Sequence, residues 1–184
     1  MLAVLLLVVG CSSSEPQVVD ESKGLSANDD SSDEGADDDD ENPKTPELSD
    51  AVKDESEAGA IAAVDYYIDA YEYAYLTSDA ESMQEIISEE CEVCWQLMDV
   101  FDDRLDDGEY SINVEFSHQV IDELVRTEHG SVIQIDLQVN SHDVVDDDGV
   151  KIDHLDEQDG GLLFLLNHDK EWRIDDIVAK DIDD

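Results

Sequence analysis

The spacing of hydrophobic residues changes once along the chain, and the first part has the period of helices. In residues 58–76, the hydrophobic side chains recur every three or four positions, which places them on one helical face. That face consists of Ile61, Val64, Ile68, Tyr71 and Tyr75, widened by Ala63, Tyr67, Ala70 and Ala74. Ser78 and Glu81 have a capping-box spacing and predict a short second helix with Met83, Ile86 and Ile87 inward. A third helix is predicted over 91–107, where Cys94, Leu97, Met98, Phe101 and Leu105 form a stripe.

After Gly108 the period falls to two, which is typical of half-buried strands. Strands are predicted over 110–116, 120–127 and 133–139, and the third has the clearest alternation. Turns are expected at 129–130 and 146–149, and a final hairpin is predicted from 161–166 and 172–179 around 167–170. Three helices followed by four or five antiparallel strands predict an α+β fold, in which a curved sheet covers the first helix.

The amino terminus has the features of an export signal. Residues 2–9 are continuously hydrophobic but too few to span a bilayer as a helix. The tetrapeptide Val8-Val9-Gly10-Cys11 resembles the lipobox of bacterial lipoprotein precursors. This resemblance implies cleavage after residue 10, diacylation of Cys11 and anchoring on the extracytoplasmic face of the cell membrane. One feature departs from that pattern, since neither Lys nor Arg precedes the hydrophobic run.

The next segment, 11–56, is predicted to be a disordered acidic tether, because it has few groups to bury and many like charges. The acidity continues into the predicted domain at 57–184, where 36 acidic and 6 basic residues follow position 56. A chain with a formal net charge of -43 repels phosphate groups, so we expect no nucleic-acid partner. The expected partners are the membrane, through the lipid, and an envelope protein or a small ligand.

The order of elements resembles the cone-shaped α+β fold of the nuclear-transport-factor-two-like, or cystatin-like, superfamily. The segments 62–67, 70–75 and 77–79, followed by Cys91-Glu92-Val93-Cys94, are also similar to an uncharacterised family of actinobacterial lipoproteins, domain of unknown function 6318. The family implies a fold and a location but no catalytic residues. Pocket enzymes of the wider superfamily use Asp, His and Tyr side chains, and their motifs have no residue-by-residue match in this sequence.

Cys91 and Cys94 lie at the predicted start of the third helix. In an oxidising exterior such a pair forms a disulfide, and a redox role or free thiols are the alternatives. A zinc site would need two further ligands, which the sequence does not supply by spacing. Thus we expect a structural disulfide.

A candidate pocket is formed by Tyr67, Tyr71, Tyr75 and Trp172, with ordinary core packing as the alternative. The five histidines are scattered, and the 146–153 region lacks the carboxylates that an EF-hand needs at its first and last positions. We therefore expect no cofactor, no metal site and no catalytic set.

Three functions remain open from the sequence. The leading hypothesis is a non-enzymatic, lipid-anchored envelope protein that binds a ligand or a partner. The first alternative is a small pocket enzyme of the isomerase, dehydratase or cyclase type, which needs a carboxylate or His beside a Tyr in a deep cavity. The second is a cation-dependent surface module, supported by the acidic composition and by a looser surface calcium site that Asp146, Asp148 and Asp153 leave open.

Overall fold

A computed structural model describes residues 43–127 and 129–180, and the predicted signal peptide, Cys11 and the tether up to residue 42 lie outside them. The helices are η1 (Asp50–Lys53), α1 (Glu57–Thr77), η2 (Glu81–Glu85) and α2 (Glu92–Asp106), where η marks a 3-10 helix. The strands are β1 (Tyr110–Ile112), β2 (Phe116–Arg126), β3 (Gly130–Val139), β4 (His142–Val145), β5 (Lys151–Leu155), β6 (Gln158–His168) and β7 (Trp172–Lys180). The predicted α+β fold is confirmed, with two α-helices in place of the three that we predicted.

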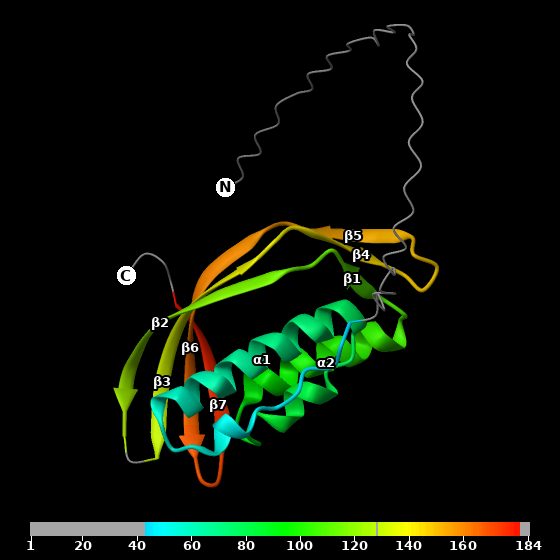
Figure 1. The fold of residues 1–184 in the computed structure, drawn as a ribbon. Helices are drawn as coiled ribbons and strands as arrows, with labels where there is room; N and C mark the ends of the chain where they lie inside the picture. Colours follow the sequence, from blue (N-terminus) through cyan, green and yellow to red (C-terminus); the bar gives the residue numbers. More distant parts are fainter. Residues whose placement is uncertain (1–42, 128, 181–184) are drawn as a thin grey trace, which may run out of the picture. The chain divides into compact units, whose positions relative to one another are not determined.

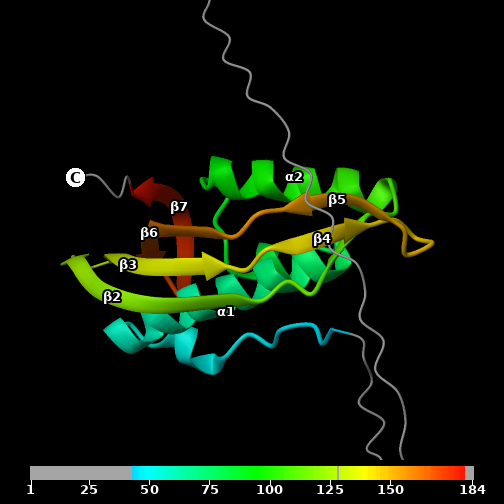
Figure 2. The ribbon, with the colours of Figure 1, turned by 90° about the horizontal axis from the view of Figure 1, so that it is seen from above.

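Two antiparallel sheets form a bent surface over the helices. The larger has the strand order β2-β3-β6-β7, and the smaller has the order β1-β4-β5. Along the chain, β1 leads into β2, β3 leads into β4 and β5 leads into β6, each after a short break. The smaller sheet therefore extends the larger one. Figures 1 and 2 show the strands bending over α1 and α2. Hydrophobic residues on the inner faces, such as Ile133, Ile135 and Phe164, are fully buried against α1.

The bend between the sheets depends on two asparagines. Asn113 has a left-handed backbone with φ 59°, a conformation that Asn tolerates better than most residues, and this ends β1. The side chain of Asn140 accepts from the backbone NH of Glu115 at 2.9 Å and donates to the carbonyl of Asn113 at 2.9 Å. A side chain therefore supplies hydrogen bonds where the backbone ladder is interrupted. The prediction of a single strand over 110–116 is therefore wrong. This segment contains β1 and the first residue of β2, which belong to different sheets.

The predicted capping box at Ser78 is also wrong. Ser78 has φ 57° and ends α1 as its left-handed C-cap, and its hydroxyl donates to the carbonyl of Glu109. Asp79 instead accepts from the NH of Glu81 at 2.9 Å, and the element that follows is the 3-10 helix η2. Its inward residues are as expected, since Met83 and Ile86 are fully buried. The other predicted helices and the 133–139 strand are confirmed, as is the β6–β7 hairpin.

Residues 43–56, which the sequence assigned to the tether, run beside α1 and pack on the domain (Figure 2). Val52 within η1 is fully buried, and Thr45 donates to the hydroxyl of Tyr73 at 3.3 Å. Ser56 caps α1 by accepting from the NH of Gly59 at 3.1 Å. The ordered domain therefore begins before the boundary at residue 57, because one buried valine and a helix cap attach this segment.

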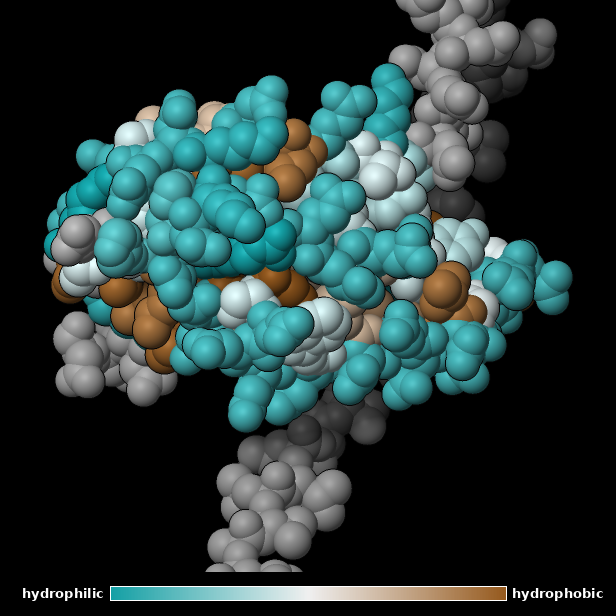
Figure 3. Space-filling model, turned by 90° about the horizontal axis from the view of Figure 1, so that it is seen from below, coloured by the Kyte–Doolittle hydropathy of each residue, from teal (hydrophilic) through white to brown (hydrophobic). Residues whose placement is uncertain are grey.

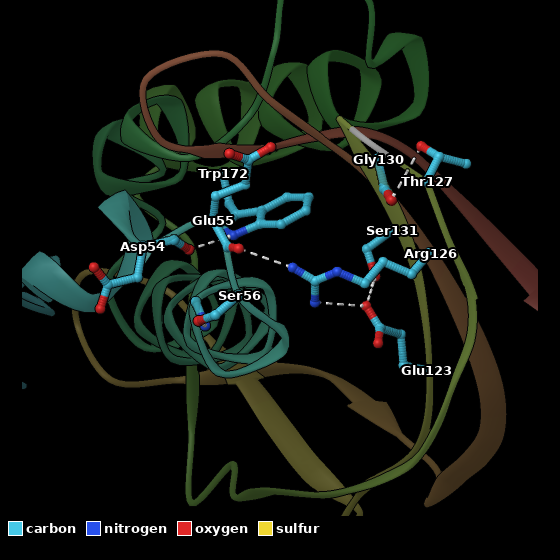
Figure 4. Close-up of polar contacts among 10 residues, drawn as sticks. Asp54, Glu55, Ser56, Glu123, Arg126, Thr127, Gly130, Ser131 and Trp172 are labelled. Carbon is cyan, nitrogen blue, oxygen red and sulfur yellow. Dashed lines mark hydrogen bonds and ion pairs between the residues drawn. The ribbon is translucent and has the colours of Figure 1, made fainter.

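A polar cluster joins the start of α1 to the sheet (Figure 4). The Nε1 of Trp172 donates to the carbonyl of Asp54 at 2.8 Å, and Arg126 donates to the carbonyl of Glu55 at 2.9 Å. The guanidinium of Arg126 also lies 5.9 Å from the centre of the Trp172 ring. Gly59 permits this close approach, since a Cβ there would lie 2.1 Å from the carbonyl oxygen of Asp54. The cluster thus holds the amino-terminal end of α1 against β2 and β7.

Arg126 is itself held in place by the β2–β3 hairpin. Its guanidinium pairs with Glu123 at 3.3 Å, and the same carboxylate accepts from the hydroxyl of Ser131 at 2.6 Å. The hairpin is closed by the NH of Thr127, which donates to the carbonyl of Gly130 at 2.8 Å. These bonds orient the guanidinium toward α1.

α2 begins at a disulfide. Cys91 and Cys94 are paired, with their Cα atoms 5.3 Å apart, and neither side chain is exposed. The NH of Trp95 donates to the carbonyl of Cys91 at 3.2 Å, so the bridged residues form the first turn of the helix. The expected disulfide is therefore present, and it restrains α2 next to the core.

Replacing Trp172 by Phe should lower the free energy of unfolding by about 1–3 kcal/mol, because the hydrogen bond to Asp54 and much of the buried ring contact are lost. Urea unfolding followed by circular dichroism measures this change. Trp95→Phe is the matched control, since Trp95 is 37% exposed, and it should cost less than about 1 kcal/mol. Equal losses in the two variants would contradict the role given to Trp172.

Reduction of the disulfide should lower the free energy of unfolding by about 2 kcal/mol at most, as expected for closing so short a loop. The measurement compares urea midpoints with and without a phosphine reductant in a Cys11→Ser background. A Cys91→Ala/Cys94→Ala variant should not respond to the reductant. If reduction, verified by mass, leaves the midpoint of the parent protein unchanged, the bridge does not contribute to stability.

Candidate functional site

A cavity of about 270 Å³ lies between the two helices and the inner face of the larger sheet. Its wall is formed by residues of α1, α2, β3, β6 and β7. The twelve lining residues are Tyr67, Ile68, Tyr71, Tyr75, Val93, Leu97, Leu137, Val139, Gln158, Leu162, Ile177 and Ala179. Most of these side chains are aliphatic or aromatic, as in typical small-ligand pockets.

The helical period of α1 places three tyrosines along the cavity. Tyr67, Tyr71 and Tyr75 are four residues apart, so they follow one another along one helical face. The ring centres of Tyr67 and Tyr71 are 6.0 Å apart, and those of Tyr71 and Tyr75 are 5.2 Å apart. Phe164 lies edge-on to Tyr67 with a centre-to-centre distance of 5.5 Å. The sequence prediction that these three tyrosines share one pocket is consistent with this cavity.

The hydroxyl of Tyr67 is buried, and it has no hydrogen-bond partner in the described part of the chain. Tyr67 is only 2% exposed. Burial raises the pKa of Tyr67 well above its usual range, so the hydroxyl stays protonated and can donate. A buried hydroxyl without a partner is unfavourable, and this one has almost no surface that a water molecule in the cavity could touch.

Tyr71 and Tyr75 continue the wall toward the smaller sheet. Burial raises the pKa of Tyr71 strongly, and the neighbouring hydroxyl of Tyr75 adds to the effect. Tyr75 also contacts His142 of β4, with ring centres 5.5 Å apart, and Phe116 at 5.3 Å. Rings from α1, β2 and β4 therefore fill the space beyond the tyrosine row.

The wall carries no ionisable side chain other than the tyrosines: among the described residues that line the cavity there is no Asp, Glu, His, Lys or Arg. Gln158 supplies the one amide side chain, and it is exposed to solvent. General acid–base catalysis needs a group that exchanges protons near neutral pH, and the raised pKa values of Tyr67 and Tyr71 do not provide one. The wall suits recognition of an uncharged molecule.

Trp172 was predicted to line the pocket, and this prediction is wrong. Its side chain is 1% exposed and belongs to the cluster at the start of α1, where its Nε1 binds the carbonyl of Asp54. Trp172 begins β7, whereas Ile177 and Ala179 of the same strand reach the cavity. The indole is therefore at the opposite end of the strand.

Val93 connects the disulfide to the cavity. It lies between Cys91 and Cys94, and it lines the cavity together with Leu97, which is one turn further along α2. The covalent bridge thus restrains the turn that carries one side of the wall.

A second group of ionisable residues, which sequence reasoning missed, lies between α1 and β2. The Nε2 of His118 is 2.8 Å from Asp65 Oδ1, and the carboxylate of Glu72 accepts from the NH of Phe116 at 3.0 Å. Partial burial raises the pKa values of Asp69 and Glu72. The spacing of Asp65, Asp69 and Glu72 along one helical face was a signal for this cluster. It lies outside the cavity wall.

One face of the molecule is mostly polar. Figure 3 shows a largely hydrophilic face on which the hydrophobic groups are separated from one another. In residues 43–127 and 129–180, no group of three or more His, Cys, Asp or Glu residues is arranged to hold a metal ion. Within the same residues, no helix is both long and apolar enough to cross a membrane.

Similarity to solved structures is limited to the fold. The chain is similar to the intermembrane-space region of the chloroplast protein ARC6, with 11% identity and a TM-score of 0.50, over 64% of this chain and 90% of that one. This likeness supports the α+β fold alone.

Two other likenesses have lower scores. A ketosteroid isomerase-like protein from Erwinia carotovora atroseptica SCRI1043 has 11% identity and a TM-score of 0.44, over 68% of this chain and 95% of that one. An NTF2-like protein of unknown function from Shewanella baltica OS155 has 13% identity and a TM-score of 0.41, over 69% and 97%. At these scores neither supports an inference about activity. No curated protein matches the chain.

The sequence profile of one family covers most of the chain. It is described as a family of unknown function, DUF6318, and it matches residues 35–177. The match includes both α-helices, both sheets apart from the last three residues of β7, and the whole cavity wall except Ala179. The chain belongs to the DUF6318 family.

Proposed function

We propose that this protein is a lipid-anchored binding protein on the extracytoplasmic face of the cell membrane, whose domain takes up a small, mainly apolar molecule in the cavity beside α1. The observation that carries the binding role is the cavity itself, with about 270 Å³ of space between apolar walls from two helices and three strands. The wall runs from buried Tyr67 to exposed Gln158 and Ala179, so the space is a pocket that opens to solvent, and a mainly apolar pocket of this kind favours a small ligand.

Binding fits the wall better than catalysis does. The alternative of a small pocket enzyme requires a carboxylate or His within reach of a tyrosine inside the cavity. Among the described residues, His142 meets the wall residue Tyr75 edge-on, with ring centres 5.5 Å apart, but does not itself line the cavity, and the hydroxyl of Tyr66 is 3.2 Å from Glu85 Oε2. Burial raises the pKa of Tyr66 to about 12, and this tyrosine is not part of the cavity wall.

The proposed location depends on the amino-terminal sequence. The run at residues 2–9 and the Val8-Val9-Gly10-Cys11 motif support acylation of Cys11, and the acidic segment after it serves as a spacer. The Cys91–Cys94 disulfide supports the same location, because such bridges persist in oxidising compartments. In this arrangement the binding domain stays close to the membrane without touching it.

Replacing Cys11 by Ala should release the protein from the membrane fraction, since the acylated sulfur is the proposed anchor. The measurement is fractionation of cells that produce the full chain, followed by immunoblotting. Ser13→Ala is the control, because it changes the same segment and keeps the sulfur at position 11, and it should leave the protein in the membrane fraction. Retention of the Cys11→Ala protein in that fraction would contradict the anchor.

Small apolar probes such as toluene should bind in the cavity and shift the methyl NMR signals of Leu137 and Leu162 in a saturable way. Leu97→Trp should abolish these shifts, because an indole at this position fills the space. Val100→Trp is the matched control on the same helix, since Val100 is 55% exposed and does not line the cavity. Unsaturable shifts, or loss of binding in both variants, would contradict the cavity as the site.

A further inference from the structure

A second, shallower hollow adjoins the cavity on the inner face of the larger sheet. It has a volume of about 150 Å³ and is lined by Leu137, Val139, Gln158, Asp159, Gly160 and Leu162. Four of these residues, Leu137, Val139, Gln158 and Leu162, also line the cavity. The two spaces therefore lie side by side along β3 and β6.

Gly160 leaves the shallow hollow open. It pairs with Leu137, whose side chain is buried on the inner face, so position 160 also faces inward. It lies between Gln158 and Leu162, which line both spaces. A Cβ at position 160 would meet no neighbouring atom within 4 Å. A glycine inside a strand often marks a place where a ligand comes close to the backbone.

The two spaces together are long. From Gln158 to Leu162 the strand advances by about 13 Å. Phe164 is the next inward residue after Leu162, and its ring centre is 5.5 Å from that of Tyr67, so the buried end of the cavity lies beyond Leu162. The other end is open, since Gln158 is exposed. A molecule that fills both spaces is therefore extended, with one end buried and one end in water.

Acidic residues surround the open end. Asp156, Glu157 and Asp159 flank Gln158 in the chain, and all three are exposed. Consecutive Cα atoms are about 3.8 Å apart, so these residues lie within about one screening length of the opening at physiological salt. A cationic group at the opening keeps its hydration and is attracted by these carboxylates, whereas an anionic group is repelled.

Lys180 does not offset this charge on the inner face. It pairs with Gly161 of β6, and its Nζ donates to Gln134 Oε1 at 3.4 Å. Gln134 lies between the buried inward residues Ile133 and Ile135, so it is on the outer face of the sheet. The ammonium of Lys180 is therefore directed away from the opening.

From the extended space and its acidic opening together we infer that the ligand is a single-chain amphiphile, an unbranched aliphatic chain that ends in a cationic group. This inference rests on the proposed function, because it concerns the same cavity. The chain lies along the inner face of β6 over Gly160 and contacts Leu137 and Leu162. The cationic group stays in water beside Gln158, outside the uncharged wall. Gly160 is the position that admits an extended chain.

The shape of the ligand is tested with octanol and cyclooctanol, which have the same number of carbon atoms and the same hydroxyl group. The full-length protein is titrated with each alcohol, and the methyl NMR signals of Leu137 and Leu162 are followed. Octanol should bind about tenfold more tightly, because roughly two further methylene groups are buried in the shallow hollow. The ratio of the two affinities is the measured quantity.

Gly160→Leu should lower this ratio at least about fivefold, because the leucine side chain fills the hollow that only the extended chain uses. Gln138→Leu is the matched control and should leave the ratio unchanged, since Gln138 is exposed on the neighbouring strand and lines neither space. Circular dichroism verifies that both variants are folded.

The charge of the head group is tested with octylammonium and octanoate at low salt. Octylammonium should bind about threefold more tightly than octanol and octanoate about threefold more weakly, and both differences should vanish at about 0.5 M salt. Asp156→Asn/Glu157→Gln should remove most of the preference for octylammonium. Asp147→Asn/Asp148→Asn removes the same charge at the other end of β5 and should preserve the preference.

The possible outcomes separate the inference from the proposed function. If the alcohols bind but Gly160→Leu leaves their affinity ratio unchanged, the extended chain is overturned and the proposed binding function stands. Binding of octanoate as tight as that of octylammonium would overturn the cationic head group. If neither alcohol binds saturably to the parent protein, the proposed binding function itself fails.

Discussion

The packing of one face of α1 against a bent antiparallel sheet is the interaction on which the rest of the structure depends. Ala60, Ala63, Ala70 and Ala74 of that helix are fully buried, and such small side chains allow the sheet to come close. The rings of Tyr67, Tyr71 and Tyr75, at every fourth position, have the opposite effect, since they hold the sheet and α2 away from the helix axis. The cavity lies along this row of rings, and its existence follows from the alternation of small and large residues on one helix.

The two ends of α1 are held by different means. At the amino end, Trp172 and Arg126 bind the carbonyls of Asp54 and Glu55, and this attaches the preceding segment to the sheet (Figure 4). At the carboxyl end, Ser78 adopts a left-handed backbone and donates to the carbonyl of Glu109. The helix is therefore fixed in position along the sheet, and the tyrosine row is fixed with it. The disulfide at the start of α2 restrains the opposite wall in the same way.

Local periodicity explains why much of the fold could be predicted from the sequence. The helix at 58–76 and the strand at 133–139 have long, regular patterns, and in both cases one face is buried as the pattern indicates. Two of the predictions that were wrong, the capping box at Ser78 and the single strand over 110–116, depend on single backbone conformations. The left-handed residues Ser78 and Asn113 divide segments whose hydrophobic pattern continues through them, and a period carries no information about such a break.

Only the part of the cavity wall that α1 contributes could be predicted from the sequence. Tyr67, Tyr71 and Tyr75 lie four residues apart, so their common face follows from the helix alone. Gln158, Ile177 and the α2 residues reach the same cavity through pairing and packing between distant segments, which sequence spacing does not contain. Trp172 shows the opposite case. It lies on the same strand as Ile177 and Ala179 of the wall, but its side chain belongs to the cluster at the start of α1.

The central claim is that the space beside the tyrosine row is a real, apolar binding cavity and is not closed by side chains in the protein. A crystal structure of the domain under xenon pressure tests it directly, since xenon enters apolar cavities without any specific polar contact. The account predicts xenon density bounded by Tyr67, Leu137 and Leu162. Side chains of α2 or β7 filling that space, with no xenon bound there, would contradict it.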